Sequence, residues 1–318
     1  MARRRKPAAA AADLVSRIER GEPGAIARAL SLVTDESEGY EALLGPLFRR
    51  SGRSHKIGFC GAPGSGKSSL INRLVTCFRK AGDTVGILAV DPTSPFTGGA
   101  FLGDRLRIQE HSLDEGVFMR SLASRGMVGG LNAAIFPALH VLEAAGFDRI
   151  LVETVGTGQD EVDIVEVVDT VVCVTAPYQG DEFQAMKAGT TEIADLFVVN
   201  KADLQEVDRA LGAIRDALSL GPEVRAGWQV RVVPAAAATG QGVAEAAAII
   251  DEHRASLKAT GEGERRRRRQ LRKELSLLVA SLIARNTLER IGERHIDALL
   301  AGTTDPLTLG RALLTEEI

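Results

Sequence analysis

Cysteine, histidine and long apolar runs are scarce in this sequence of 318 residues. Its three cysteines, Cys60, Cys77 and Cys173, stand far apart inside apolar stretches, which is typical of reduced core thiols in a cytoplasmic protein rather than of disulfide bridges or a metal cage. No apolar run approaches the roughly 20 residues of a membrane span, and no apolar segment of the signal-peptide kind follows the basic N-terminus. Because the formal net charge is only -3, we expect neither nucleic acid nor a membrane as partner.

Short β-branched runs alternate with helical stretches along most of the chain, which is typical of an α/β protein with a doubly wound, mostly parallel sheet. Such sheets bind their ligands at the carboxyl ends of the strands. We expect an N-terminal tail and helical extension over 1–55, a domain holding the sheet over 56–258, and a C-terminal helical arm over 259–318. The expected strands are 56–60, 84–90, 116–121, 148–153, 170–175, 195–199 and 230–233.

A phosphate-binding motif follows the first expected strand. Residues 61–68 fit G-x-x-x-x-G-K-[ST], and apolar residues at helical spacing come after them, so the strand, loop and helix that the motif requires are present. Glycines let successive backbone N–H groups point at phosphates, Lys67 adds a full charge at the β- and γ-phosphates, and the Ser68 hydroxyl is a ligand for Mg²⁺. The motif predicts a P-loop NTPase whose nucleotide contacts are Gly61, Ala62, Pro63, Gly64, Ser65, Gly66, Lys67, Ser68 and Ser69.

Acidic residues after two other strands are candidates for the metal site. Asp91 follows the second strand, and Asp104 ends the Gly-rich segment after it; each is a candidate Mg²⁺ neighbour, directly or through water, with turn forming or helix capping as the alternative. Glu153 ends the fourth strand as a Walker B acid does and would order the water shell of the metal, while the N–H of Gly156 would meet the γ-phosphate. Gln159 is a candidate to position the attacking water, and helix capping is its alternative role.

A second motif, N-K-x-D, follows the sixth expected strand at residues 200–203. A carboxylate facing guanine accepts hydrogen bonds from N1–H and the exocyclic amine, whereas adenine presents an acceptor at N1, so Asp203 selects guanine. Asn200 braces the loop, and the stem of Lys201 covers the base. After the last strand we expect a loop whose backbone N–H meets guanine O6, and alanines occupy it. The predicted nucleotide is GTP, with this loop contributing Ala236, Ala237 and Ala238.

Beyond an expected hinge at 261–264, leucines at helical spacing predict amphipathic helices. Five arginines, Arg265 to Arg269, open this arm; a solvated helix start is one interpretation, and a contact for an acidic partner is the other. The apolar stripe of the arm is larger than monomers usually expose, so we expect the arm to hold a dimer.

Taken together, the motifs resemble those of the methylmalonyl-CoA mutase-associated GTPases, the MeaB/ArgK family. The resemblance covers about 56–203, nearly half of the chain. Besides the P-loop and N-K-x-D, it is carried by Asp91-Pro92-Thr93-Ser94, Leu102-Gly103-Asp104-Arg105, Arg120-Ser121, Gly129-Gly130-Leu131, Glu153-Thr154-Val155-Gly156 and Gly180-Asp181-Glu182.

The resemblance implies a GTP-hydrolysing chaperone that gates cofactor loading, protection or reactivation of an adenosylcobalamin-dependent methylmalonyl-CoA mutase or related acyl-CoA mutase. It implies Mg²⁺ with GTP or GDP as ligand, no cobalamin bound by this chain itself, and a homodimer built with the C-terminal arm. It further implies a switch that relays the nucleotide state to the mutase, for which a plain helix N-terminus is the alternative. The switch residues would be Gly180, Asp181, Glu182, Gln184 and Lys187.

Other functions stay open at this point. A GTP-dependent kinase linked to arginine and ornithine transport would transfer phosphate to an acceptor instead of to water. A metallochaperone GTPase would need Cys-rich or His-rich ligands, which three isolated cysteines and 5 histidines do not provide. A GTP-binding protein without turnover would bind the nucleotide tightly and release no phosphate.

Overall fold

The computed structural model describes residues 5–91, 110–111, 113–123, 134–154, 163–177, 190–219 and 226–315. The chain divides into two compact units, Met1–Arg268 and Arg269–Ile318, which are described separately below. The first unit holds the sheet, whereas the second is helical.

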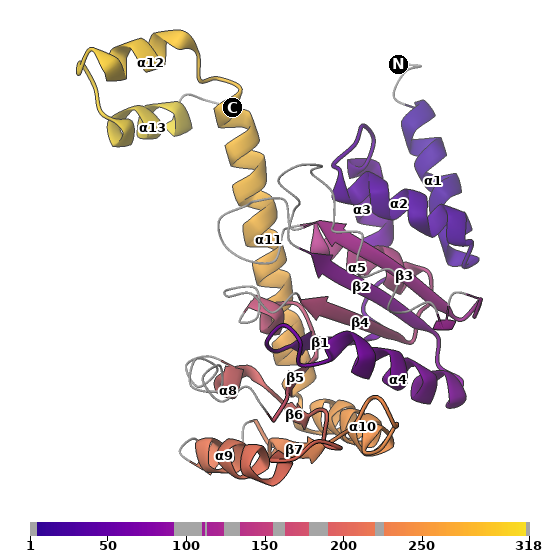
Figure 1. The fold of residues 1–318 in the computed structure, drawn as a ribbon. Coiled ribbons are helices and arrows are strands. Elements are labelled where there is room, and N and C mark those ends of the chain that lie inside the picture. The colour runs from indigo at the N-terminus through magenta and orange to yellow at the C-terminus, as the bar shows by residue number, and fades with distance from the viewer. Residues whose placement is uncertain are drawn as a thin grey trace. The chain divides into compact units, whose positions relative to one another are not determined.

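Within the described residues, seven strands form one sheet in the order β3-β2-β4-β1-β5-β6-β7, and every pairing is parallel (Figure 1). The predicted α/β class is therefore confirmed, and each expected strand matches an observed one to within two residues. β-Branched and apolar residues at these positions suit strands that are covered on both faces. The strands are β1 His55–Cys60, β2 Val85–Asp91, β3 Val117–Ala123, β4 Arg149–Thr154, β5 Thr170–Thr175, β6 Leu196–Val199 and β7 Arg231–Pro234.

Strand β1 lies at the centre of the sheet, between β4 and β5. The chain winds outward from β1 through β2 and β3, returns at β4, and then continues to the other side through β5, β6 and β7. This reversal next to β1 is the switch point of a doubly wound sheet, where loops at the carboxyl ends diverge and leave room for a ligand. The loop after β1 is therefore placed where a ligand binds.

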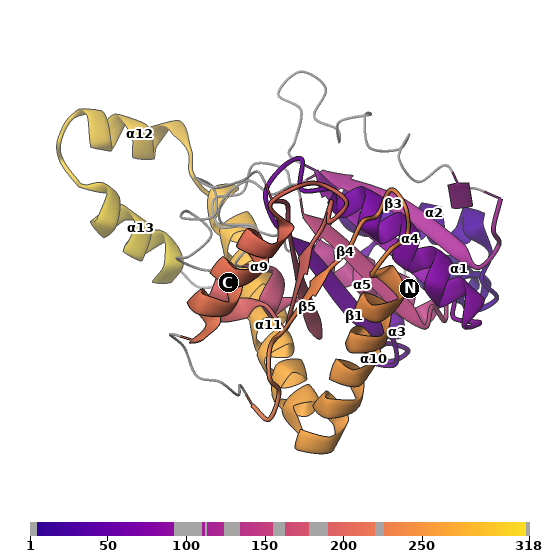
Figure 2. The ribbon, with the colours of Figure 1, turned by 60° about the horizontal axis from the view of Figure 1, so that its bottom comes forward.

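Helices cover both faces of the sheet. Helices α4 (Lys67–Lys80) and α10 (Val243–Thr260) contact each other, and their apolar residues join alternate residues of β1 and β2 in one core cluster (Figures 1 and 2). On the opposite face, α5 (Ile135–Ala144) approaches Gly86, where an added Cβ would lie 2.9 Å from Leu142. The remaining described helical segments of this region are η2 Ile164–Glu166, α8 Thr190–Ile193 and α9 Val207–Ser219.

The N-terminal extension is helical and packs against α5. Its helices are α1 (Arg5–Glu19), α2 (Pro23–Thr34) and α3 (Glu41–Phe48). The sequence predicts a tail at the start of 1–55, but α1 begins already at Arg5, because an alanine run, the strongest helix-forming composition, precedes Asp13.

A single glycine separates α10 from the following helix. Gly261 has φ +72°, and α11 (Glu262–Leu288) starts directly after it, so the break between the helices is one residue long. The other residues of the segment expected as a hinge, 262–264, and the arginine run lie inside a continuous helix. Two shorter helices, α12 (Glu293–Leu300) and α13 (Pro306–Thr315), complete the second unit. Among the described helices, none has the length and apolar character to cross a bilayer.

A buried chain of polar side chains lies at the amino edge of the sheet. His55 Nε2 is 2.7 Å from Thr170 Oγ1, which in turn is 2.8 Å from His253 Nδ1. Burial lowers the pKa of His55 to about 3 and the pKa of His253 to about 4, so both rings are neutral at pH 7. Asp195 lies 3.4 Å from His253 Nε2 and accepts two hydrogen bonds of 2.7 Å from Arg266, which fastens the first turns of α11 to the sheet.

Candidate nucleotide site

The loop between β1 and α4 has a backbone that only glycine tolerates at two points. Gly61 has φ +129°, and an added Cβ would lie 1.9 Å from the carbonyl oxygen of Val174. Gly66 has φ +90°, and its Cβ would lie 2.2 Å from Asn200 Nδ2. These close approaches let the loop fold tightly over the ends of β1 and β5, with α4 starting at the next residue.

The first turn of α4 presents donors to the space in front of the loop. Its hydrogen-bond ladder begins with the N–H of Leu70, which donates to Gly66 O, so the amides of Lys67, Ser68 and Ser69 precede it. Lys67 is 6% exposed, and its ammonium group donates to the loop carbonyls of Gly61 at 2.5 Å and Ala62 at 3.2 Å. A buried cation, oriented amides and a helix N-terminus together make a site for phosphate.

The Ser68 hydroxyl lies beside the acidic end of β4. Ser68 Oγ donates a 2.7 Å hydrogen bond to Glu153 Oε1, and Ser68 is 8% exposed. Asp91 ends β2, the neighbour of β4, where Val90 is in register with Thr154. Hydroxyl and carboxylate oxygens are the hard donors that Mg²⁺ prefers, so the donor set fits that ion next to a bound phosphate. Among the described residues, no group of three or more His, Cys, Asp and Glu side chains could hold a metal ion alone.

Asn200 connects the phosphate loop to the loop after β7. It is 2% exposed, and its Nδ2 donates to Ser65 O at 2.9 Å and to Gly66 O at 3.3 Å. Its Oδ1 accepts a 3.1 Å hydrogen bond from the N–H of Ala237. The bracing role that the sequence predicted for Asn200 therefore has a direct geometric basis.

The rest of N-K-x-D is less buried than Asn200. Lys201 takes a left-handed backbone conformation with φ +59°, and the N–H of Ala202 donates to Ala235 O at 2.9 Å. Asp203 is exposed. The left-handed turn ends β6 and fixes the loop against the segment after β7, which leaves the carboxylate accessible to a base.

The alanine loop after β7 is held by hydrogen bonds from its own backbone N–H groups. The N–H groups of Ala235, Ala236 and Ala237 donate to Val199 O, Gln241 O and Asn200 Oδ1, respectively. In the part of the chain that the structure describes, the N–H of Ala238 has no acceptor, and Ala238 is exposed. Of the three alanines predicted to bind guanine, Ala238 is the one with an amide available for it.

Arg73 belongs to this arrangement, and motif analysis missed it. From the second turn of α4, its Nε donates to Ala237 O at 3.0 Å and its Nη2 to Ala238 O at 3.4 Å. Its partners are 164 and 165 residues away in sequence, and no local pattern marks such a contact.

Several predicted site residues lie outside the described residues. For Asp91 only the backbone at the end of β2 is described. The roles predicted for the others stay predictions; they are Asp104, Gly156, Gln159, Gly180, Asp181, Glu182, Gln184 and Lys187.

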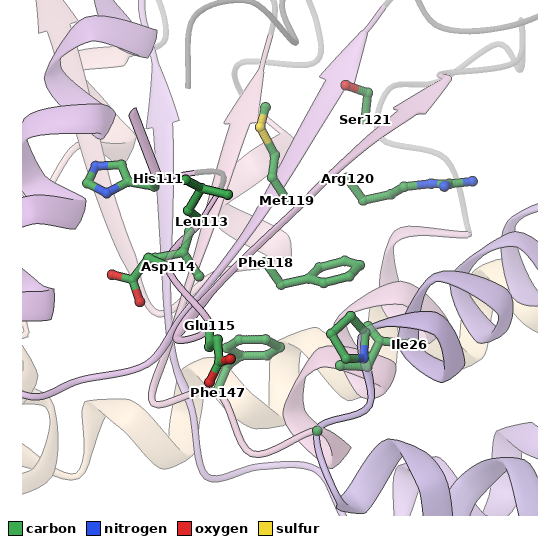
Figure 3. Close-up of a pocket in the computed structure, with 13 residues that line it drawn as sticks. Ile26, His111, Leu113, Asp114, Glu115, Phe118, Met119, Arg120, Ser121 and Phe147 are labelled. Atoms are coloured by element: carbon green, nitrogen blue, oxygen red, sulfur yellow. The ribbon is translucent and has the colours of Figure 1, made fainter. Parts of the chain in front are cut away.

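A separate cavity of about 600 Å³ runs along the edge strand β3 (Figure 3). Phe118 and Phe147, whose ring centroids are 6.2 Å apart, line it together with Ile26 of α2. At one end Arg120 donates a 2.8 Å hydrogen bond to Ser31. The described lining residues include none of those predicted to bind nucleotide, so this cavity is distinct from the phosphate site.

A parallel sheet with a phosphate loop after its central strand, a Ser–acid pair beside that loop and a guanine motif two strands further on define a P-loop GTPase. A model of the family described as methylmalonyl Co-A mutase-associated GTPase MeaB matches residues 26–291. The chain belongs to the MeaB family, and it is a GTPase.

Known proteins agree with this assignment along nearly the whole chain. A putative GTPase of Pyrococcus horikoshii is 42% identical over 306 residues, which cover 95% of this chain and 96% of the relative. The mitochondrial methylmalonic aciduria type A homolog of Caenorhabditis elegans is 32% identical over 280 residues, covering 83% of this chain and 67% of the relative. A crystal structure of an LAO/AO transport system kinase superposes with a TM-score of 0.71 at 27% identity and covers 96% of both chains.

Proposed function

We propose that this GTPase is a chaperone that gates cofactor loading, protection or reactivation of an adenosylcobalamin-dependent methylmalonyl-CoA mutase or a related acyl-CoA mutase. The observation that carries the proposal is membership of a family described as mutase-associated, matched over residues 26–291. The nucleotide site supplies the physical means, because a GTPase has two states that a partner can distinguish.

In the proposed site, the amides of 61–69 and the ammonium group of Lys67 bind the phosphates. Ser68 holds Mg²⁺, with Glu153, Asp91 and Asp104 as its direct or water-mediated neighbours. Gly156 meets the γ-phosphate, and Gln159 positions the attacking water. The 2.7 Å contact between Ser68 and Glu153 supports this division of roles, since it places the hydroxyl and the strand-end carboxylate side by side.

At the base, Asp203 accepts from N1–H and the exocyclic amine of guanine, and the N–H of Ala238 donates to O6. Exchanging the carboxylate for an amide reverses one of the donor–acceptor pairs, so Asp203→Asn should bind GTP at least tenfold more weakly and xanthosine triphosphate more tightly. Competition binding of both nucleotides to the two proteins measures this. Equal competition by GTP and ATP for the unmutated protein would refute the base assignment.

Coupling to the mutase is assigned to Gly180, Asp181, Glu182, Gln184 and Lys187, the segment between the acidic strand β4 and the guanine motif. A coupling element contributes to the difference between states rather than to binding. We therefore expect Asp181→Ala and Lys187→Ala to leave GTP affinity nearly unchanged and to remove the effect of the mutase on hydrolysis. Single-turnover hydrolysis with and without the mutase is the test; stimulation that survives both substitutions would assign coupling elsewhere.

A kinase function is the second candidate, because the chain superposes on a protein described as a transport system kinase. The two functions differ in the acceptor of the γ-phosphoryl group. Incubation with γ-labelled GTP, alone and with arginine- or ornithine-transport components, separates them. Label released only as inorganic phosphate supports the chaperone function, whereas label on an acceptor supports the kinase.

A further inference from the structure

The stretch proposed to read guanine O6, Ala236 to Ala238, has no polar side chain of its own. Ala236, Ala237 and Ala238 carry only methyl groups, so polar contacts to this stretch go to its backbone. Within the loop, Thr239 Oγ1 donates to Ala236 O at 3.3 Å, and among the described residues two side chains contact this stretch from outside the loop. Asn200 accepts from the N–H of Ala237 at 3.1 Å, and Arg73 donates to the carbonyls of Ala237 and Ala238 at 3.0 and 3.4 Å.

The contact of Arg73 controls the direction of one particular amide. Ala237 C=O and Ala238 N–H belong to the same peptide unit, which is planar, and no cis peptide bond occurs in the described residues. In a trans unit the C=O and the N–H point in opposite directions. Holding Ala237 O against the guanidinium group of Arg73 therefore turns the N–H of Ala238 away from α4, and this is the loop amide without an acceptor in the described chain.

The contact of Arg73 also makes the N–H of Ala238 a stronger donor. A cation that donates to the carbonyl oxygen polarises the peptide unit and makes its N–H a stronger donor. Guanine offers an acceptor at O6, whereas adenine offers an amino group at the same position, which would face this N–H as a second donor. A fixed, polarised N–H therefore favours guanine over adenine.

We propose that Arg73 is a positioning residue for base selection, which aims the N–H of Ala238 at guanine O6. This inference rests on the proposed guanine role of the alanine loop. Because Arg73 stands on α4, the helix whose first turn lies at the phosphates, it also links the base end of the site to the phosphate end.

The test compares nucleotides that differ at O6. Equilibrium affinities of GTP, 6-thio-GTP and ATP are measured for the unmutated protein, Arg73→Ala and Arg73→Lys. 6-Thio-GTP keeps the groups that face Asp203 and replaces O6 with sulfur, a weaker acceptor. For Arg73→Ala we expect GTP affinity to fall about tenfold with little change for 6-thio-GTP, while Arg73→Lys, which keeps one donor, lies in between.

Arg79→Ala is the matched control. It removes another arginine from α4, one whose Nε and Nη2 donate to Asp114 at 2.9 and 2.8 Å instead of to the loop, and it should keep the unmutated ratio of GTP to 6-thio-GTP. Thermal unfolding of the nucleotide-free proteins checks that each variant folds. If Arg73→Ala does not fold, the affinities of Arg73→Lys provide the test. If the folded Arg73 variants keep the ratio of GTP to 6-thio-GTP affinity of the unmutated protein, the positioning role of Arg73 is overturned. Failure of the unmutated protein to prefer GTP over ATP refutes the base assignment instead.

Discussion

At the scale of single residues, the site depends on close backbone contacts that allow no side chain. Gly61→Ala would force a Cβ to within 1.9 Å of Val174 O, so the loop must move or the strands must separate. We expect a loss of about 3 kcal/mol or more in the free energy of unfolding. Gly64→Ala is the control, because Gly64 has φ +77° but no neighbour within 4 Å, and it should lose only about 1 kcal/mol. Urea denaturation measures both, and equal losses would contradict the steric argument.

The pair Ser68 and Glu153 leads to a prediction about metal dependence. Ser68→Ala removes a proposed Mg²⁺ ligand and the donor to Glu153, and we expect GTP hydrolysis at saturating Mg²⁺ to fall on the order of 100-fold. Glu153→Ala should retain GTP binding with slow turnover. Thr76→Ala, which removes a hydroxyl two turns further along α4, is the control and should hydrolyse GTP normally. Unchanged turnover of Ser68→Ala across a Mg²⁺ titration would exclude the metal role.

Motif residues could be located from the sequence because each stands at a fixed spacing that phosphate or base chemistry requires. The roles of Arg73 and Arg266 could not be located from the sequence. Arg73 meets carbonyls 164 and 165 residues away, and Arg266 pairs with Asp195, 71 residues away, so neither contact leaves a local signal. In the arginine run the solvated interpretation fits Arg265 and Arg268, whose side chains are 57% and 75% exposed, but it misses Arg266 at 12%.

At the scale of elements, strands were easier to predict than helix ends. Buried parallel strands consist of short, nearly continuous apolar runs, and their bounds are marked by polar residues or glycine. Helix ends depend on weaker signals. The alanines before Asp13 and the arginines after Gly261 are all good helix formers, so α1 starts early and α11 runs straight through the arginine segment.

The buried histidine chain gives the sheet a predictable response to acid. His253 has a pKa of about 4 in the folded protein and about 6.5 when unfolded, so between these values the unfolded state binds more protons. The stabilisation of the folded state by His253 is complete above pH 6.5 and is lost as the pH falls to about 4. His55 contributes in the same way, and its stabilisation is lost down to about pH 3. From pH 7 to pH 5 we expect the unfolding free energy to fall by about 2 kcal/mol on account of His253.

Urea denaturation at pH 7 and pH 5 measures this loss in the unmutated protein and in His253→Gln. The variant cannot take up a proton at this position, so its pH dependence should be smaller by the contribution of His253. Asp195 and Arg266 face the same ring and remain in both proteins. An identical pH dependence of the two proteins would show that His253 is not the group responsible.

At the scale of the whole molecule, the division into two units raises the question of what the second unit does. The order of the strands could not be read from the sequence, because hydrophobic patterns fix which residues form strands but not which strands become neighbours.

In the second unit, apolar residues of α11 are exposed at helical spacing. They are Leu275 at 62%, Leu278 at 38%, Val279 at 44%, Leu282 at 39% and Ile283 at 43%.

This stripe is the basis of the predicted homodimer, because association would remove it from water. Sedimentation at micromolar concentration should give a dimer for the full chain and a monomer for the double variant Leu275→Lys with Leu282→Lys. Ala280→Lys with Ala284→Lys places the same charges on the opposite side of α11 and should leave the dimer intact. A monomeric full-length protein would rule out the dimer.

The proposal that a mutase reads the nucleotide state is tested most directly by affinity. Binding of an adenosylcobalamin-dependent methylmalonyl-CoA mutase to this GTPase is measured with Mg²⁺ and either GDP or a non-hydrolysable GTP analogue. Coupling between the nucleotide state and the mutase predicts affinities that differ between the two states by about tenfold or more. Equal affinity in both states, or no binding in either while the chain still hydrolyses GTP, would contradict it.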